Sequence, residues 1–178
     1  MALISQKLSE IWQKMGQVLS VMYPEYVDNP PFLPPVNEER ICEIEKKLGV
    51  LFPDEYRLSL KIHEGTVGAL WLWDAIAISD LNVVLEDHAA YMKEVSYPNM
   101  QGLSLTATGP VTSKLFVPLW IPVATDNGIP ICLDFAPARG GVVGQIIYVD
   151  MEDGTVKVIA KNFIEFLEAG LAKMASKI

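Results

Sequence analysis

The chain of 178 residues has only two histidines and two cysteines with which to do acid–base, nucleophilic or metal chemistry. His63 comes just before Gly65, at the predicted end of a helix, and His88 falls inside a helical stripe. Neither belongs to a nucleophile motif or to an HExxH arrangement, in which two histidines bind zinc. Cys42 and Cys132 have neither the spacing of a metal site nor the number for a disulfide framework. The sequence therefore predicts no catalytic residue, no metal site and no cofactor, and two buried thiols in a reducing cytoplasm.

Two further segments superficially resemble ligand-binding loops. Residues 140–144, with the sequence GGVVG, suggest a phosphate loop, but such a loop must lead into a helix whose amino end holds the anion. Here it leads into a predicted strand. The acidic turn at residues 150–153 lacks the alternating oxygen ligands of a calcium loop, so a solvated hairpin is the simpler interpretation. One alternative stays open, in which folding brings distant carboxylates to His63 and makes a small enzyme or ligand-binding domain.

Negative charge is concentrated in the middle of the chain. Residues 62–156 hold eleven Asp and Glu but only three basic residues, which gives a net charge of −8, whereas the flanking segments hold eleven of each. The simplest explanation is solubility. The alternative is steering of a cationic partner, because a concentrated field of one sign accelerates association with the opposite sign. Nucleic acid is disfavoured as a partner, since its phosphates would be repelled.

The strand-forming part of the chain lies mainly between residues 116 and 160. β-branched and aromatic residues cluster there in short blocks between turn formers. Strands are predicted at residues 70–79, 117–124, 129–135, 142–149 and 155–160. Pro118 and Pro122 cannot donate to a strand ladder and should place their strand at a sheet edge or in a bulge. Trp71 and Trp73 share one face of the earliest strand, which is either core or a binding surface.

Acidic residues occupy the turns between these strands. The Asp126-Asn127-Gly128 and Asp153-Gly154 turns each join two strand-forming runs, and residues 134–141 form a wider loop. Residues 97–110 are polar and aperiodic and predict a long loop. Loops around the sheet are thus the predicted contact surface for a protein partner. The residues we expect there are Asp126, Asn127, Asp134, Arg139, Glu152 and Asp153.

Apolar residues at intervals of three and four predict five helices. They cover residues 4–22, 37–49, 53–65, 80–94 and 162–174. Residues 23–36 contain five prolines and predict an irregular connector. The predicted organisation is an accessory amino-terminal helix (1–23), a proline-rich connector (24–36) and a domain (37–178), within one globular unit. We find no signal peptide and no membrane span, since the longest apolar run is far short of the ~18 residues required.

Two groups of motifs occur in a fixed order along the chain. The first contains Leu48-Gly49-Val50, Phe52-Pro53-Asp54-Glu55-Tyr56 and His63-Glu64-Gly65. The second contains Trp120-Ile121-Pro122, Gly128, Cys132-Leu133-Asp134, Gly144-Gln145-Ile146-Ile147 and Phe163-Ile164-Glu165-Phe166-Leu167. Together they resemble the SUKH superfamily, also called the Smi/Knr family, over residues 37–170. We assign structural roles to Pro53, Tyr56, Gly65, Trp120, Pro122, Gly128, Gly144, Phe163 and Phe166, with Trp120 in the core.

The chain departs from the family pattern at three sites. Glu64 stands where relatives have Asn, and Ile129-Pro130 where they have a polar and an aromatic residue. Asn162 replaces Ser before the last helix and is an equally good N-cap. Only the first two departures affect local surface detail.

The resemblance implies an α+β fold with a mostly antiparallel, twisted sheet and helices packed against it. It also implies a binding role without catalysis. Bacterial members are regarded as immunity proteins that neutralise a cognate toxin, often a nuclease, and fungal relatives regulate cell-wall assembly. The sequence thus suggests a cytoplasmic immunity protein whose partner is a basic toxin domain, or alternatively a regulatory or scaffold protein.

Overall fold

The computed structural model describes residues 1–67, 76–95, 104–115 and 117–178 and confirms the α+β class. The helices are α1 (Ala2–Met22), α2 (Glu38–Leu48), α3 (Asp54–Leu60), α4 (Leu81–Val95) and α5 (Phe163–Ala175), with a short 3-10 helix η1 (Pro24–Tyr26). The strands are β1 (Ile76–Ile78), β2 (Thr106–Thr108), β3 (Trp120–Asp126), β4 (Ile129–Asp134), β5 (Gln145–Asp150) and β6 (Thr155–Ala160). Trp71 and Trp73 lie outside the described residues.

The six strands form one sheet in the order β1-β3-β4-β5-β6-β2. Four consecutive strands, β3 to β6, make an antiparallel meander, and β1 joins it antiparallel to β3. β2 pairs parallel with β6. The prediction of an uninterrupted loop over residues 97–110 is therefore wrong at β2. Its three residues are all exposed and show no alternation of apolar and polar side chains, so no strand pattern was present.

A bulge lies beside Pro122 in β3. The register of β3 against β4 shifts between Pro122 and Ala124, which confirms the bulge that was one of the two predicted alternatives. The other alternative, an edge strand, is wrong, because β1 covers the free side of β3 through residues 124–126. Pro118 precedes the strand and takes no part in the ladder.

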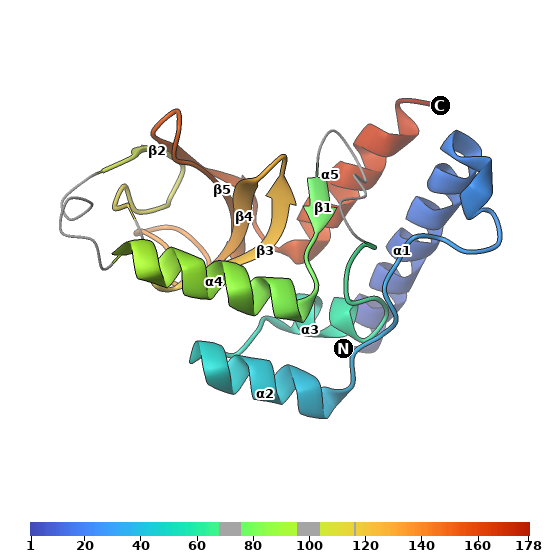
Figure 1. The fold of residues 1–178 in the computed structure, drawn as a ribbon. Helices are drawn as coiled ribbons and strands as arrows, with labels where there is room; N and C mark the ends of the chain where they lie inside the picture. Colours follow the sequence, from blue (N-terminus) through green and yellow to red (C-terminus); the bar gives the residue numbers. More distant parts are fainter. Residues whose placement is uncertain (68–75, 96–103, 116) are drawn as a thin grey trace.

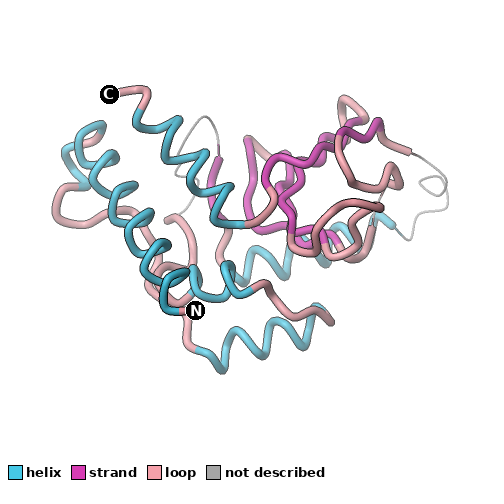
Figure 2. The backbone as a smooth tube through the Cα atoms, turned by 180° about the vertical axis from the view of Figure 1, so that it is seen from behind, coloured by secondary structure: helices cyan, strands magenta, loops and turns pink. Residues whose placement is uncertain are grey.

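Side chains alternate between the two faces of the sheet and pack into two cores. On one face, residues such as Ile131, Leu133 and Ile146 pack with apolar side chains of α1, α2, α3 and α5. On the other face, Trp120 and Cys132 belong to a smaller core that Tyr91 of α4 covers. Figures 1 and 2, seen from opposite sides, show α4 and α5 on opposite sides of the strands.

The first helix packs on the rest of the chain. Leu8, Trp12 and Met15 of α1 are at most 2% exposed and belong to the larger core. The indole of Trp12 donates a hydrogen bond of 2.9 Å to Ser59 Oγ in α3. α1 also lies beside α5 (Figure 2). Its apolar stripe is therefore satisfied within the molecule.

Two motif glycines allow close approaches that a side chain would block. A Cβ at Gly144, where φ is +85°, would lie 2.5 Å from Pro53 Cγ, and a Cβ at Gly65 would lie 2.6 Å from the Ile78 carbonyl oxygen. Helix α3 ends at Leu60 rather than near Gly65 as predicted. The reason is that residues 62–67 leave the helix and run beside β1, where Thr66 N donates to Ile78 O at 3.0 Å.

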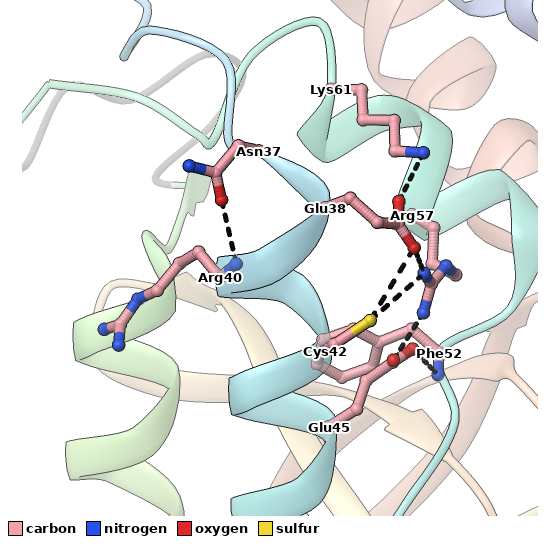
Figure 3. Close-up of polar contacts among 8 residues, drawn as sticks. All are labelled: Asn37, Glu38, Arg40, Cys42, Glu45, Phe52, Arg57 and Lys61. Carbon is pink, nitrogen blue, oxygen red and sulfur yellow. Dashed lines mark hydrogen bonds and ion pairs between the residues drawn. The ribbon is translucent and has the colours of Figure 1, made fainter.

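A polar network joins α2 to α3 and to Lys61, which follows α3 (Figure 3). Arg57 forms ion pairs with Glu45 and with Glu38, and Lys61 pairs with Glu38 at 2.5 Å. Glu45 is 4% exposed and also accepts a hydrogen bond from Phe52 N at 2.7 Å. The nearby Cys42 is exposed, so the prediction of a buried thiol is wrong there. Cys42 lies on the side of α2 that faces these charged groups rather than the core.

Candidate functional site

Four of the six predicted partner-contacting residues lie at one end of the sheet. β3 and β5 both finish at this end, so the β3–β4 and β5–β6 turns are neighbours. Asn127, Glu152 and Asp153 are exposed there and Asp126 is half-buried. We call the three carboxylates of this group, Asp126, Glu152 and Asp153, the acidic end.

Local hydrogen bonds shape the acidic end. Asp150 Oδ1 accepts from Glu152 N at 3.0 Å and from Asp153 N at 2.9 Å, which closes the turn and leaves the Glu152 and Asp153 side chains in solvent. Burial, followed by the charges of Asp126, Asp150 and Asp153, raises the pKa of Tyr148. Carboxylates of both turns thus act on one ring.

The other two predicted contact residues, Asp134 and Arg139, lie away from this group. Asp134 ends β4 at the opposite end of the sheet, has no exposed surface, and cannot contact a partner. Its carboxylate instead accepts hydrogen bonds from Trp120 Nε1 (3.2 Å), Ala136 N (2.9 Å) and Gln145 Nε2 (2.9 Å). Burial raises the pKa of Asp134. Arg139 is exposed in the loop after β4, so the sheet separates it from the acidic end.

A cavity of about 200 Å³ lies between α4 and the β3–β4 hairpin. We call it the α4 groove. Asp87, Ala90, Tyr91 and Glu94 line it from α4, and Trp120, Pro122, Ala124, Thr125, Gly128, Pro130 and Cys132 line it from the hairpin. Because Thr125 and Gly128 flank Asp126, the groove opens beside the acidic end.

Sequence reasoning did not find the α4 groove. Its signal was present as a second stripe on α4, since residues 87, 90, 91 and 94 recur at helical spacing beside the apolar stripe that includes Leu81 and Val84. A half-polar stripe of this kind is also typical of a solvated helix face. Only the position of β3 and β4 makes it the wall of a cavity.

The groups that line the α4 groove suit cation binding better than acid–base chemistry. Asp87 and Glu94 are exposed carboxylates, and partial burial followed by the charge of Glu86 raises the pKa of Asp87. Burial raises the pKa of the Cys132 thiol, which disfavours the thiolate that a nucleophilic cysteine needs. Tyr91 Oη accepts a hydrogen bond of 2.7 Å from Val117 N, which fixes the ring as a wall.

His63 lies beside a separate cavity of about 520 Å³ between α1 and the connector. Its Nδ1 is 3.1 Å from Leu33 O, and its ring packs against Trp12 and Phe32 at centroid distances of 5.2 and 5.0 Å. Burial lowers the pKa of His63, although the hydrogen bond to Leu33 opposes this shift. The described lining of this cavity includes no carboxylate.

His88 Nε2 is 2.9 Å from Pro118 O, a contact that ties α4 to the segment before β3.

Within the described ranges, no three His, Cys, Asp or Glu side chains converge as a metal site would require. Nor does any helix in those ranges have the length and apolar character needed to cross a membrane.

Comparison with known proteins places the motifs in context. The model of the SMI1 / KNR4 family (SUKH-1) matches residues 35–169. The chain is 28% identical over 171 residues to "Cell wall assembly regulator SMI1" of Saccharomyces cerevisiae, covering 75% of this chain and 34% of that protein. It is 28% identical over 152 residues to "Cell wall biosynthesis/cell cycle regulator smi1" of Schizosaccharomyces pombe, covering 71% and 28%. The chain thus spans about a third of the length of these curated relatives.

Proposed function

Because this chain belongs to the SMI1/KNR4 family (SUKH-1), we propose that it is a non-catalytic protein-binding domain whose partner presents a basic surface. One observation carries this proposal. The carboxylates of the acidic end, together with Asp87 and Glu94 of the α4 groove, form no ion pair with another described residue, unlike Glu38, Glu43 and Glu45 on α2. The acids at the acidic end and in the α4 groove therefore keep their charge for a cationic partner.

The names of the relatives favour a regulatory role for this binding. Both are described as regulators of cell-wall assembly or biosynthesis, so we propose that this chain acts by holding or sequestering a protein partner. A second role, the neutralisation of a toxin, is favoured by the concentrated negative charge. A toxin that attacks nucleic acid has a cationic cleft for phosphates, and an inhibitor that offers carboxylates would compete for it. Co-expression with a candidate toxin, scored by survival of the cells, separates the two roles.

The test of the basic partner is the association rate. After affinity capture and purification of a partner, we expect charge reversal at Asp126, Glu152 and Asp153 to slow its association more than its dissociation. The rate should also fall steeply with added salt, because exposed charges are screened beyond ~8 Å at physiological ionic strength. An association rate indifferent to salt would refute the proposal.

The control needs acids whose reversal breaks no ion pair. Glu38 and Glu43 on α2 are unsuitable because Arg57, Lys61, Arg40 and Lys47 pair with them. Glu25, Asp28 and Glu39 are exposed and form no ion pair with another described residue. Reversal of these three changes the net charge equally. If it slows association as much as reversal at the acidic end does, the partner does not face that end.

The absence of catalysis is tested separately. We expect no hydrolytic, transferase or redox turnover in a broad activity screen, because the described surroundings of His63 hold no nucleophile–base pair. Any turnover that His63→Ala abolishes while the fold stays intact would favour the enzyme alternative.

A further inference from the structure

We infer that the α4 groove binds a single arginine side chain of the partner, which anchors the contact. The inference rests on the proposed function and adds the chemical group that the partner must supply. It assigns separate tasks to two neighbouring surfaces: the acidic end attracts the partner, and the α4 groove holds one side chain of it.

The spacing of the two groove carboxylates defines a site for one cation. Asp87 and Glu94 are seven residues apart on α4, which separates their backbones by about 10 Å along the helix axis. The small side chain of Ala90 lies between them and leaves the wall open. A cationic group that enters beside Ala90 therefore meets carboxylates on both sides. Lining residues that the structure describes include no Lys, Arg or His to compete with it.

The floor of the groove suits the stem of a long side chain. Pro122 and Pro130 have no backbone N–H, so they offer carbon surface. Trp120 and Cys132, which lie beneath, are at most 3% exposed and bring no charge. A floor from which water is largely excluded strengthens the attraction between a cation and the carboxylates at the rim.

Arginine fits this arrangement better than lysine. A guanidinium group is planar, weakly hydrated and able to stack on an aromatic ring, whereas an ammonium group is compact and strongly hydrated. The ring of Tyr91 stands in the groove wall between Asp87 and Glu94, and its hydroxyl is fixed by Val117 N. A guanidinium group in the groove can thus contact the part of the ring that lines it and donate to a carboxylate at the same time.

The probe is the peptide acetyl-Gly-Gly-Arg-Gly-Gly-amide, with Lys or norleucine in place of Arg as comparisons. In amide NMR spectra of the full chain, we expect the arginine peptide to shift resonances of residues 87–94 and 122–132. The lysine peptide should bind at least threefold more weakly, and the norleucine peptide should cause no saturable shift. Equal binding of all three, or shifts located elsewhere on the protein, overturns the inference.

Two variants test the groove itself. Asp87→Asn with Glu94→Gln should weaken arginine-peptide binding at least tenfold, and Ala90→Trp should abolish it by filling the cavity without a change of charge. The matched control, Glu86→Gln with Glu39→Gln, removes the same charge outside the groove and should stay within twofold of the wild type. If the control weakens binding as much, the effect is one of net charge and the inference falls.

The partner separates this inference from the proposed function. The Asp87→Asn, Glu94→Gln variant should raise the dissociation rate of a captured partner, while reversal at the acidic end slows association. If the groove variant leaves dissociation unchanged and association still depends on salt and on the acidic end, the arginine anchor is wrong and the basic partner stands. If neither added salt nor charge reversal at the acidic end changes the association rate, the proposed function itself is wrong.

Discussion

The buried ion pair between Glu45 and Arg57 gives the sharpest quantitative prediction (Figure 3). Glu45 is 4% exposed, and its second oxygen accepts from Phe52 N, so its charge is compensated by one cation and one amide. Arg57→Met removes the cation and leaves a carboxylate buried. Breaking a buried pair in this way costs about 3 to 5 kcal/mol. We expect that loss in the free energy of unfolding at pH 7.

The opposite substitution should cost much less. Glu45→Gln keeps an oxygen that can accept from Phe52 N, and Arg57 keeps its pairing with Glu38. We expect a loss of about 1 kcal/mol, typical of one hydrogen bond. The double variant contains no buried charge, so it should be more stable than Arg57→Met alone. The coupling between the two substitutions should be about 2 kcal/mol.

Urea unfolding followed by tryptophan fluorescence measures all three variants. The dependence of the unfolding free energy on urea should be unchanged, which shows that the variants alter stability rather than the surface exposed on unfolding. A loss below about 1 kcal/mol for Arg57→Met would mean that water or another group solvates Glu45. Additive losses in the double variant would show that the two side chains do not act as a pair.

Three further predictions concern the cores and His63. Trp120→Ala should cost about 3 to 5 kcal/mol, because Trp120 is fully buried, and a melting midpoint near that of the wild type would contradict a core role. Tyr56→Phe should stabilise the protein by about 1 kcal/mol, since the buried Tyr56 hydroxyl has no hydrogen-bond partner among the described residues, and a clear loss of stability would reveal one. Burial lowers the pKa of His63 in the folded state, so its contribution is present above its ordinary pKa and lost as pH falls below it. Stability should therefore decline less from pH 7 to pH 5 in His63→Gln than in the wild type, and equal declines would contradict this sign.

The fold was largely predictable from the sequence because local chemistry and tertiary structure agree. Asn37 caps α2 through Arg40 N at 2.8 Å, Asn162 caps α5 through Glu165 N at 2.9 Å, and the four strands of the meander alternate with their turns along the chain. β2 was missed because its pairing with β6 is parallel and joins residues about 50 positions apart. The residues around β2 in the sequence therefore do not indicate its pairing with β6.

The candidate site was less predictable, since a sequence does not show which polar residues become buried. Asp134 and Asp126 are both the last residues of strands. Asp134 is nevertheless fully buried and hydrogen-bonded to Trp120, whereas Asp126 is half-buried beside a turn. The α4 groove escaped notice because its two walls are about 30 residues apart in sequence. Charge counting selected a region of the chain but could not distinguish the two ends of the sheet.

The packing of α1 against α5 has a consequence for synthesis on the ribosome. About 140 residues separate the end of α1 from the start of α5. At roughly 5 to 20 residues per second, α1 waits about 7 to 30 s for the helix that covers it. During that interval α1 has no α5 to pack against, so we expect chaperones that bind apolar helices to recognise the nascent chain. Release of a chaperone should coincide with the emergence of α5.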